Sequence, residues 1–317
     1  MITAAEATAL TARLCCVARA ICLLEWALNR REMRPGGVLN WSIAGLVDFS
    51  AHGLVKSRLE ALTARLSHRA FLALLVLDGL VTTALFIFPA NPILLGAAAS
   101  LLLIQMKRHY LCYDGADEAV FFCLMALTVG KITGADRLTA WFIAAEACLA
   151  YLVAGIYKAA SPFWKGGQAL LLITRTRLFG REDVAKILRR HVRITAASEF
   201  AIVFWESVFP IALFVPPEVL IPILAVGLFF HLSCAWIMGL NTFLWAFGAM
   251  YPCVIFANQE LRSALSPATR DYLSIGLLLT IGGAVALLTA LVPRLRPLKN
   301  DYLGQVGELA PTAPATR

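Results

Sequence analysis

The chain has 317 residues, of which 60% are hydrophobic and 15% are charged, and its formal net charge is +8. Soluble domains contain roughly 45–50% apolar and about 25% charged residues, so this composition excludes an ordinary soluble enzyme, a disordered protein and a disulfide-stapled secreted module. At about 20 apolar residues per membrane span, the length accommodates about eight or nine helices and no second, water-soluble domain.

Long apolar segments predict the membrane-spanning elements. Helices are expected because backbone polar groups in lipid must be hydrogen-bonded within the segment. In chain order the spans are expected at 9–28, 69–88, 92–106, 117–134, 139–160, 194–215, 218–239, 241–257 and 273–293. The predicted fold is therefore an all-α, polytopic membrane helix bundle of about nine transmembrane helices. Eight is the alternative, since only Gly239 and Asn241 suggest a break between the seventh and eighth segments.

The remaining segments are predicted to lie outside the spans. Residues 38–55 are apolar but hold an aspartate and a histidine, which indicates an interfacial or re-entrant segment. The basic, amphipathic loop 167–193 predicts a surface helix on anionic headgroups, or a gate over a lipid-facing cavity. We expect residues 1–298 to form a single transmembrane domain and residues 299–317 a disordered cytoplasmic tail.

The lysines and arginines predict the orientation. With nine spans, the loops on one side carry 21 of the 28 basic residues and the opposite loops carry 4. Basic loops remain in the cytoplasm, so we expect the N-terminus outside, the C-terminus in the cytoplasm and insertion in the plasma membrane. This asymmetry accounts for most of the net charge, and no nucleic-acid partner is expected. The eight cysteines show no metal-ligand spacing and are interpreted as buried thiols.

Lys158, near the end of the fifth predicted span, is the first candidate functional residue. Ionisable groups inside a membrane are costly and are functional hypotheses by default. Tyr151 and Gly155 share its helix face, and the glycine would let a substrate approach the amine. Loss of solvation would let the amine serve as a base. The alternative is a lysine that extends to the cytoplasmic headgroups.

Two carboxylates and one histidine are further candidates for proton transfer. Glu199 and Glu206 are seven residues apart, so they face the same way at about 10 Å along one helix. One would hold a proton while the other pairs with a cation, or both would be structural partners. His231, among apolar residues, would transfer a proton or bind a headgroup; the alternative is a satisfied core histidine.

Three acidic residues at the start of the fourth span predict a metal site. Asp114, Asp117 and Glu118 have a D-x-x-D-E spacing that would share a divalent cation such as Mg²⁺ and thereby hold a diphosphate. The alternative is a helix N-terminus, where acidic residues favour the positive end of the helix dipole.

Three segments resemble a single family. They are KRHYLCYDGADEAVFFCL, YLVAGIYKAASPFWKGGQAL and FFHLSCAWIMGLNTFLWAFGAMYP. They resemble the membrane domain of vitamin K-dependent gamma-carboxylase and its bacterial relatives, the HTTM (horizontally transferred transmembrane) proteins, in the same order over about residues 9–293. The middle segment is the most specific, with a small residue, Gly155, two further positions, Lys158, and then tryptophan and glycine.

The resemblance implies that Lys158 is the base linked to quinone oxygenation and that His231 lies in a stretch lining the site. The chain departs from the carboxylase in two respects. It has Tyr157 and Lys158 where the carboxylase has a lysine pair, and it lacks room for a lumenal, propeptide-binding part. Peptide carboxylation is therefore not expected, and an isoprenoid cavity in the membrane is what the resemblance implies.

Together these patterns predict a membrane enzyme that acts on a lipophilic isoprenoid substrate, with terpene or prenyl cyclisation by acid–base chemistry as the leading reaction. The expected catalytic residues are Lys158, His231, Glu199 and Glu206. The expected substrate-binding residues are Tyr151, Gly155, Tyr157, Trp205, Trp236 and Asn241.

Alternative functions stay open from the sequence. Carboxylase-like quinol chemistry would need a reduced quinone, whereas cyclisation of a diphosphate substrate would use Mg²⁺. A non-catalytic maturation or immunity partner of a secreted peptide would instead have a peptide partner. A transporter ranks last, because the sequence shows no inverted repeat.

Overall fold

The computed structural model describes residues 1–291 except 35, 38, 41–65 and 110–111. Within these residues the chain is helical, with no strand. The helices are α1 (Ala4–Leu28), α4 (His68–Ile87), α5 (Pro92–Arg108), α6 (Gly115–Thr133), α7 (Asp136–Ala160), α8 (Pro162–Lys165), α9 (Ala169–Thr174), α10 (Glu182–Arg190), α11 (Val192–Val208), the 3₁₀ turn η2 (Phe209–Leu213), α12 (Pro217–Met238), α13 (Asn241–Gly248), α14 (Tyr251–Ala264) and α15 (Pro267–Leu291). The all-α prediction is confirmed.

The chain folds as two compact units. Among the described residues, the larger unit comprises Met1–Tyr151 with Phe209–Leu278, and the smaller comprises Leu152–Val208 with residues 279–291. Helices α7 and α15 each begin in the larger unit and end in the smaller one.

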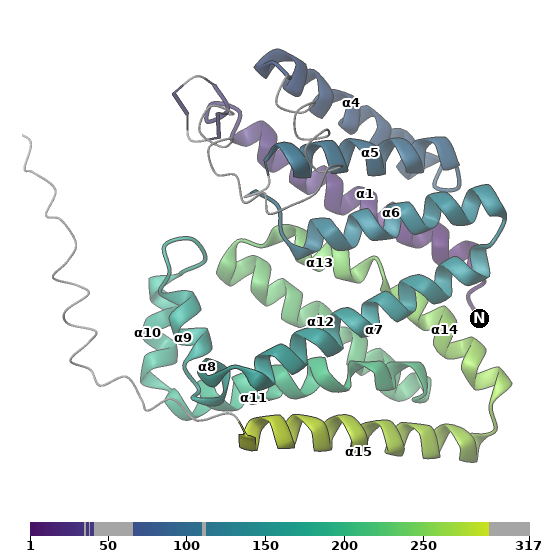
Figure 1. Ribbon diagram of the computed structural model, residues 1–317, viewed down its shortest axis with the longest axis vertical. Helices are drawn as coiled ribbons and strands as arrows, with labels where there is room; N and C mark the ends of the chain where they lie inside the picture. The colour runs from purple at the N-terminus through teal and green to yellow at the C-terminus, as the bar shows by residue number, and fades with distance from the viewer. Residues whose placement is uncertain (35, 38, 41–65, 110–111, 292–317) are drawn as a thin grey trace, which may run out of the picture. The chain divides into compact units, whose positions relative to one another are not determined.

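In the larger unit, α1 is the central helix. It packs against α4, α6, α13 and α14, while α5 packs between α4 and α6 and α12 packs on α13 (Figure 1). Local sequence sets the helix ends. Thr3 and Glu6 form a capping box at the start of α1, and Asn91 caps α5 ahead of Pro92. Gly239 ends α12 in the left-handed conformation.

In the smaller unit, the short helices α8, α9 and α10 gather around α11. α9 packs on both α10 and α11, and α8 contacts α9 and α11. The Thr195 hydroxyl in α11 donates to the Leu188 carbonyl of α10 at 2.9 Å, which ties the two helices together. The predicted surface helix in loop 167–193 is thus two helices, α9 and α10.

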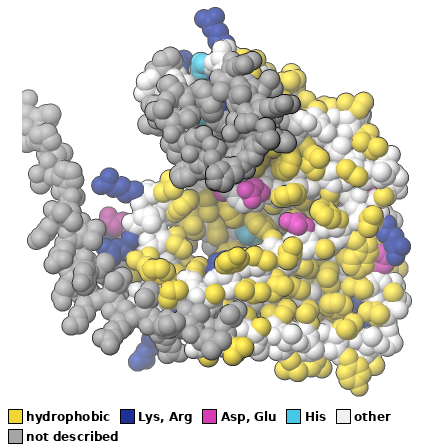
Figure 2. Space-filling model, viewed as in Figure 1, with side chains coloured by type: hydrophobic (Ala, Val, Ile, Leu, Met, Phe, Trp, Pro, Cys, Tyr) yellow, Lys and Arg dark blue, Asp and Glu magenta, His cyan; other side chains and the backbone are white. Residues whose placement is uncertain are grey.

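Among the residues that the structure describes, six helices are long and apolar enough to cross a membrane. They are Ala4–Leu28, His68–Ile87, Asp136–Ala160, Val192–Leu213, Pro217–Met238 and Pro267–Leu287. Their outward side chains are apolar, as at Val76 and Leu80, each 65% exposed. Hydrophobic side chains also dominate the surface visible in Figure 2. These features are those of an integral membrane protein.

Three of the nine predicted spans are not among these six helices. The segments 92–106 and 117–134 are helical, in α5 and α6, but neither helix combines the length and the apolar composition of the six. The prediction of one helix over 241–257 is wrong, because α13 ends at Gly248 and α14 begins at Tyr251. Pro252 follows at once, where its missing N–H is tolerated only in a first helical turn. Most of 38–55, and all of 299–317, lie outside the described residues.

Candidate functional site

Three side chains of the larger unit form a buried hydrogen-bonded chain. The Tyr151 hydroxyl on α7 lies 2.8 Å from His231 Nε2 on α12 and 2.8 Å from the Tyr251 hydroxyl on α14. Tyr151 and His231 are each 2% exposed, and Tyr251 is 5% exposed. Hydroxyl and imidazole groups both donate and accept hydrogen bonds, so a proton can move along this chain.

Aromatic rings surround this chain. The imidazole of His231 stacks on Phe247, with ring centroids 4.4 Å apart, and the Tyr151 ring lies 4.2 Å from Phe209. Phe243 stacks on Phe247 in turn, and both are only half-buried. The surroundings are therefore apolar, with π-faces that attract a positive charge.

The structure joins two predicted residues here and adds one that sequence reasoning missed. Tyr151 was expected to bind substrate and His231 to be catalytic, and they contact each other directly. Sequence reasoning missed Tyr251 because one continuous helix over 241–257 would not distinguish its hydroxyl from its neighbours. The break before α14 makes Tyr251 the first residue of a helix. The Met-Tyr-Pro sequence at this break was the available signal.

In the smaller unit, Lys158 and Glu206 form an ion pair. Lys158 Nζ lies 2.8 and 2.6 Å from the two carboxylate oxygens of Glu206. The Glu206 side chain is 3% exposed and that of Lys158 is 22% exposed. The ammonium also lies 5.4 Å from the centre of the Trp164 ring, within the range of a cation–π contact. The sequence left open which cation Glu206 would meet, and the structure selects Lys158.

Glu199 has a different partner, although it lies two turns from Glu206 on α11. Its Oε1 accepts the Leu170 backbone N–H at 2.9 Å, at the start of α9. The side chain is fully buried, and its Oε2 has no hydrogen-bond partner among the described residues. Glu199 therefore tethers α9 to α11.

Gly155 has a packing role in place of the expected substrate contact. A Cβ atom here would lie 2.5 Å from the Ser207 backbone nitrogen on α11. The space beside the glycine is thus filled by α11, and no substrate group fits between them. The small residue lets α7 approach α11 closely enough for Lys158 to reach Glu206.

The other expected substrate-binding residues are dispersed. Tyr157 and Trp236 project from the surface, at 75% and 67% exposure. Asn241 donates to Glu25 Oε1 at 2.7 Å, and Trp205 is half-buried on α11. Of the six residues expected to bind substrate, only Tyr151 belongs to the hydrogen-bonded chain.

The acidic residues at the start of α6 serve as a helix cap. Asp114 accepts the Ala116 N–H at 2.9 Å, and Asp117 accepts the Asp114 N–H at 3.3 Å, so the two form a capping box. Glu118 is exposed. No group of three or more His, Cys, Asp or Glu side chains in the described part of the chain could hold a metal. The geometry agrees with the helix-terminus alternative, not with the predicted Mg²⁺ site.

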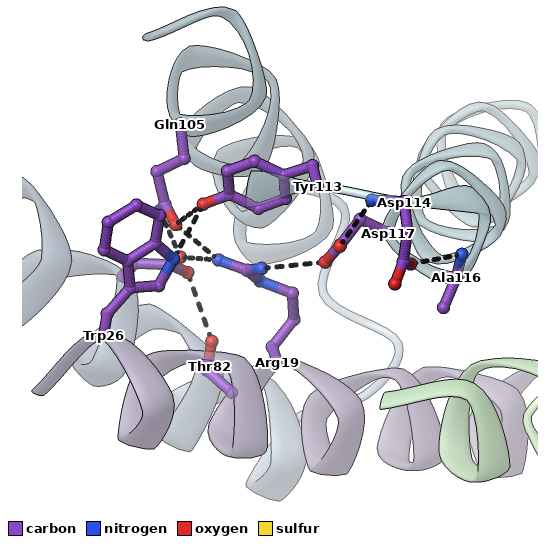
Figure 3. A network of polar contacts seen from close by, with 9 residues as sticks. Arg19, Trp26, Thr82, Gln105, Tyr113, Asp114, Ala116 and Asp117 are labelled. Atoms are coloured by element: carbon purple, nitrogen blue, oxygen red, sulfur yellow. Dashed lines mark hydrogen bonds and ion pairs between the residues drawn. The ribbon is translucent and has the colours of Figure 1, made fainter. Parts of the chain in front are cut away.

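A third polar cluster centres on Arg19 in the larger unit (Figure 3). Arg19 Nη2 donates to Asp78 at 2.5 Å and to Gln105 Oε1 at 2.8 Å, and Gln105 Nε2 donates to the same Asp78 oxygen at 2.6 Å. The Tyr113 hydroxyl donates to Gln105 Oε1 at 3.1 Å. Asp117 lies 3.8 Å from Arg19 Nη1, beyond hydrogen-bonding distance. The Arg19 cluster thus links α1, α4, α5 and the start of α6.

Comparison of the chain with protein-family models, curated protein sequences and solved structures found no match. The resemblance to the carboxylase and HTTM proteins therefore stays a prediction. The features of the structure that bear on function are the hydrogen-bonded chain, the Lys158–Glu206 pair and the Arg19 cluster.

Proposed function

We propose that the protein is an integral membrane enzyme that carries out acid–base chemistry on a lipophilic, isoprenoid-type substrate. The observation that supports this most directly is the buried Tyr151–His231–Tyr251 chain in its aromatic surroundings. The Lys158–Glu206 pair is a second candidate acid–base couple, in the smaller unit.

Cyclisation of a prenyl chain is the reaction that these groups fit best. Protonated His231 would give a proton to a terminal double bond, the resulting carbocation would close a ring, and the neutral imidazole would take a proton from the cyclic cation to give the product. Phe209, Phe243 and Phe247 would stabilise the cation by their π-faces. Asp114 and Asp117 are engaged in backbone capping, so the proposal begins with protonation and not with ionisation of a metal-bound diphosphate.

A second candidate reaction is proton removal from a quinol. The contact between a tyrosine hydroxyl and an imidazole nitrogen favours it, because the imidazole can accept a proton that the hydroxyl relays. This reaction would precede oxygenation in a carboxylase-like enzyme and would need a reduced quinone, as the resemblance implies.

Deuterium incorporation tests both reactions. The protein is expressed in a bacterial host supplied with prenyl diphosphates and quinones, in D₂O medium, and organic extracts are compared by mass spectrometry with those of the same host without the protein. We expect a new cyclic prenyl product that carries one carbon-bound deuterium more than background exchange introduces. The host without the protein measures that background. An oxygenated quinone without that deuterium would favour the second reaction. Identical extracts would contradict the enzyme and favour a partner of a secreted peptide.

We further propose that the protein lies in the plasma membrane, with the N-terminus outside and the C-terminus in the cytoplasm. The 21 to 4 distribution of basic residues between the two sets of loops supports this orientation. A green fluorescent protein fused after Arg317 should therefore fluoresce, and alkaline phosphatase fused there should be inactive. The reverse pattern would contradict the orientation.

A further inference from the structure

A short stretch of the smaller unit carries most of the excess positive charge of the protein. Residues 175–193 hold seven lysines and arginines and two acidic residues, so they contribute +5 to the net charge of +8. Both acidic side chains are paired within this stretch. Glu182 lies 2.9 Å from Lys186, and Asp183 lies 2.5 Å from Arg181. The remaining positive charge is therefore not neutralised by the acidic residues of this stretch.

Five arginines carry this remaining charge, and we call them the arginine patch. They are Arg175, Arg177, Arg189, Arg190 and Arg193. All five are exposed, at the end of α9, in the turn after it, in the last turn of α10 and in the first turn of α11. Their side chains form no hydrogen bond or ion pair within the part of the chain that the structure describes. The five guanidinium groups are thus available to an external anion.

Exposed aliphatic side chains lie between these arginines in the chain. Each of them is more than half exposed, and they are Leu178, Ile187, Val192 and Ile194. They are not the apolar residues that pack α10 against the rest of the smaller unit, because that role belongs to Val184 and Ala185, which are buried. Basic and aliphatic side chains that alternate on one surface suit the boundary between lipid headgroups and acyl chains.

The fold places the arginine patch at a membrane surface. Residues 161–191 connect α7 to α11, and both helices belong to the six that are long and apolar enough to cross a membrane. Within the smaller unit, α9 and α10 run crosswise to α11 (Figure 1). The hydrogen bond from Thr195 to Leu188 holds α10 at the start of α11. A helix that runs crosswise to a membrane-crossing helix at its end lies along the membrane surface, which is the level of the headgroups.

We propose that the arginine patch binds the headgroups of anionic phospholipids in the membrane that holds the protein. Clusters of about four to eight basic residues beside a membrane-crossing helix are typical of anionic-lipid binding. A guanidinium donates two parallel hydrogen bonds to phosphate oxygens, which a single ammonium cannot do. The aliphatic side chains extend into the acyl region beneath the headgroups. An acidic protein would match the arginines but would leave these aliphatic side chains in water.

A fluorescent probe at position 187 tests this binding in the full-length protein. Ile187→Cys is labelled with an environment-sensitive dye on a Cys112→Ser background, because the native Cys112 is exposed. The labelled protein in neutral detergent is titrated with phosphatidylglycerol, or with phosphatidylcholine of the same acyl chains. We expect a saturable blue shift of the emission with phosphatidylglycerol only. Salt at about 0.5 M should reverse the shift, since exposed charges are screened.

Paired substitutions connect this response to the arginine patch. Arg189→Gln with Arg190→Gln should raise the amount of phosphatidylglycerol at half-maximal response at least about tenfold, since each basic residue near an anionic surface contributes severalfold to binding. Arg30→Gln with Arg31→Gln is the matched control. It removes an adjacent and equally exposed arginine pair from the larger unit, so the half-maximal amount should stay that of the labelled parent.

A second pair keeps the test independent of one helix. Arg175→Gln with Arg177→Gln changes the end of α9 and the turn after it, and it should also raise the half-maximal amount. Equal responses to the two lipids would overturn the proposal, as would equal half-maximal amounts in the patch variants and the matched control. A blue shift of the same size with soluble poly-L-glutamate would point to an acidic protein and would overturn it as well.

This binding is independent of the proposed acid–base reaction. The arginine patch lies in the smaller unit, whereas the hydrogen-bonded chain lies in the larger one. His231→Gln should therefore respond to phosphatidylglycerol as the labelled parent does. A protein that binds this lipid through the patch without forming any new lipid would support the patch while contradicting the proposed enzyme.

Discussion

Asp78→Ala is expected to lower the free energy of unfolding by about 3–5 kcal/mol, because it leaves the Arg19 guanidinium buried without its main counterion. Arg19 is 1% exposed and Asp78 is fully buried, and the two are 2.5 Å apart. Gln105 would also lose the carboxylate that accepts its amide hydrogen. Reversible unfolding in detergent, followed by loss of helical signal, measures the change.

The reference for this experiment is Arg137→Ala. Arg137 pairs with Glu260 at the same 2.5 Å, but its side chain is 74% exposed. Its removal should cost only about 0–1 kcal/mol, as for other exposed ion pairs. The double variant Arg19→Met with Asp78→Leu should recover most of the loss, since neither charge remains buried. Equal losses in Asp78→Ala and Arg137→Ala would contradict this account of the Arg19 cluster.

The helical fold could be predicted from the sequence because lipid permits few structures. Runs of apolar residues mark the helices, and capping residues such as Thr3 and Asn91 mark where they begin. The break between α13 and α14 was not predicted. An apolar run across it looks continuous by composition, and only the backbone requirement of Pro252 interrupts it. Composition thus predicts that a helix is present more reliably than it predicts where the helix begins and ends.

The candidate site could be predicted only in part, for a different physical reason. His231 stood out because an imidazole in an apolar helix is unusual, and Lys158 and Glu206 because buried charges need partners. The partners themselves depend on how helices pack, which no local pattern encodes. Gly155 illustrates this. The sequence pattern shows a small residue on the helix face of Lys158, but it does not show that Ser207 fills the space beside the glycine. The hydroxyl of Tyr251 carries no charge, so the only signal for it was indirect, the Met-Tyr-Pro sequence at the helix break.

The largest effect on activity is expected at the hydrogen-bonded chain. His231→Gln should lower the rate of product formation about 10²–10⁴-fold, the range for loss of a general acid or base. Tyr151→Phe removes one oxygen that touches both His231 and Tyr251, so it should approach the same loss. The rate is measured on the cyclic product in detergent-solubilised protein, together with the unfolding temperature of each variant.

Tyr157→Phe is the matched control for Tyr151→Phe. It makes the same chemical change on the same helix, but Tyr157 is 75% exposed and projects from the surface. Its rate should therefore equal that of the wild type. If Tyr151→Phe were as active as Tyr157→Phe, proton transfer would not pass through the buried hydroxyl, and the Lys158–Glu206 pair would become the acid–base couple to test. A loss of activity that followed only the unfolding temperature would instead give the hydrogen-bonded chain a structural role, holding α7, α12 and α14 together in the larger unit.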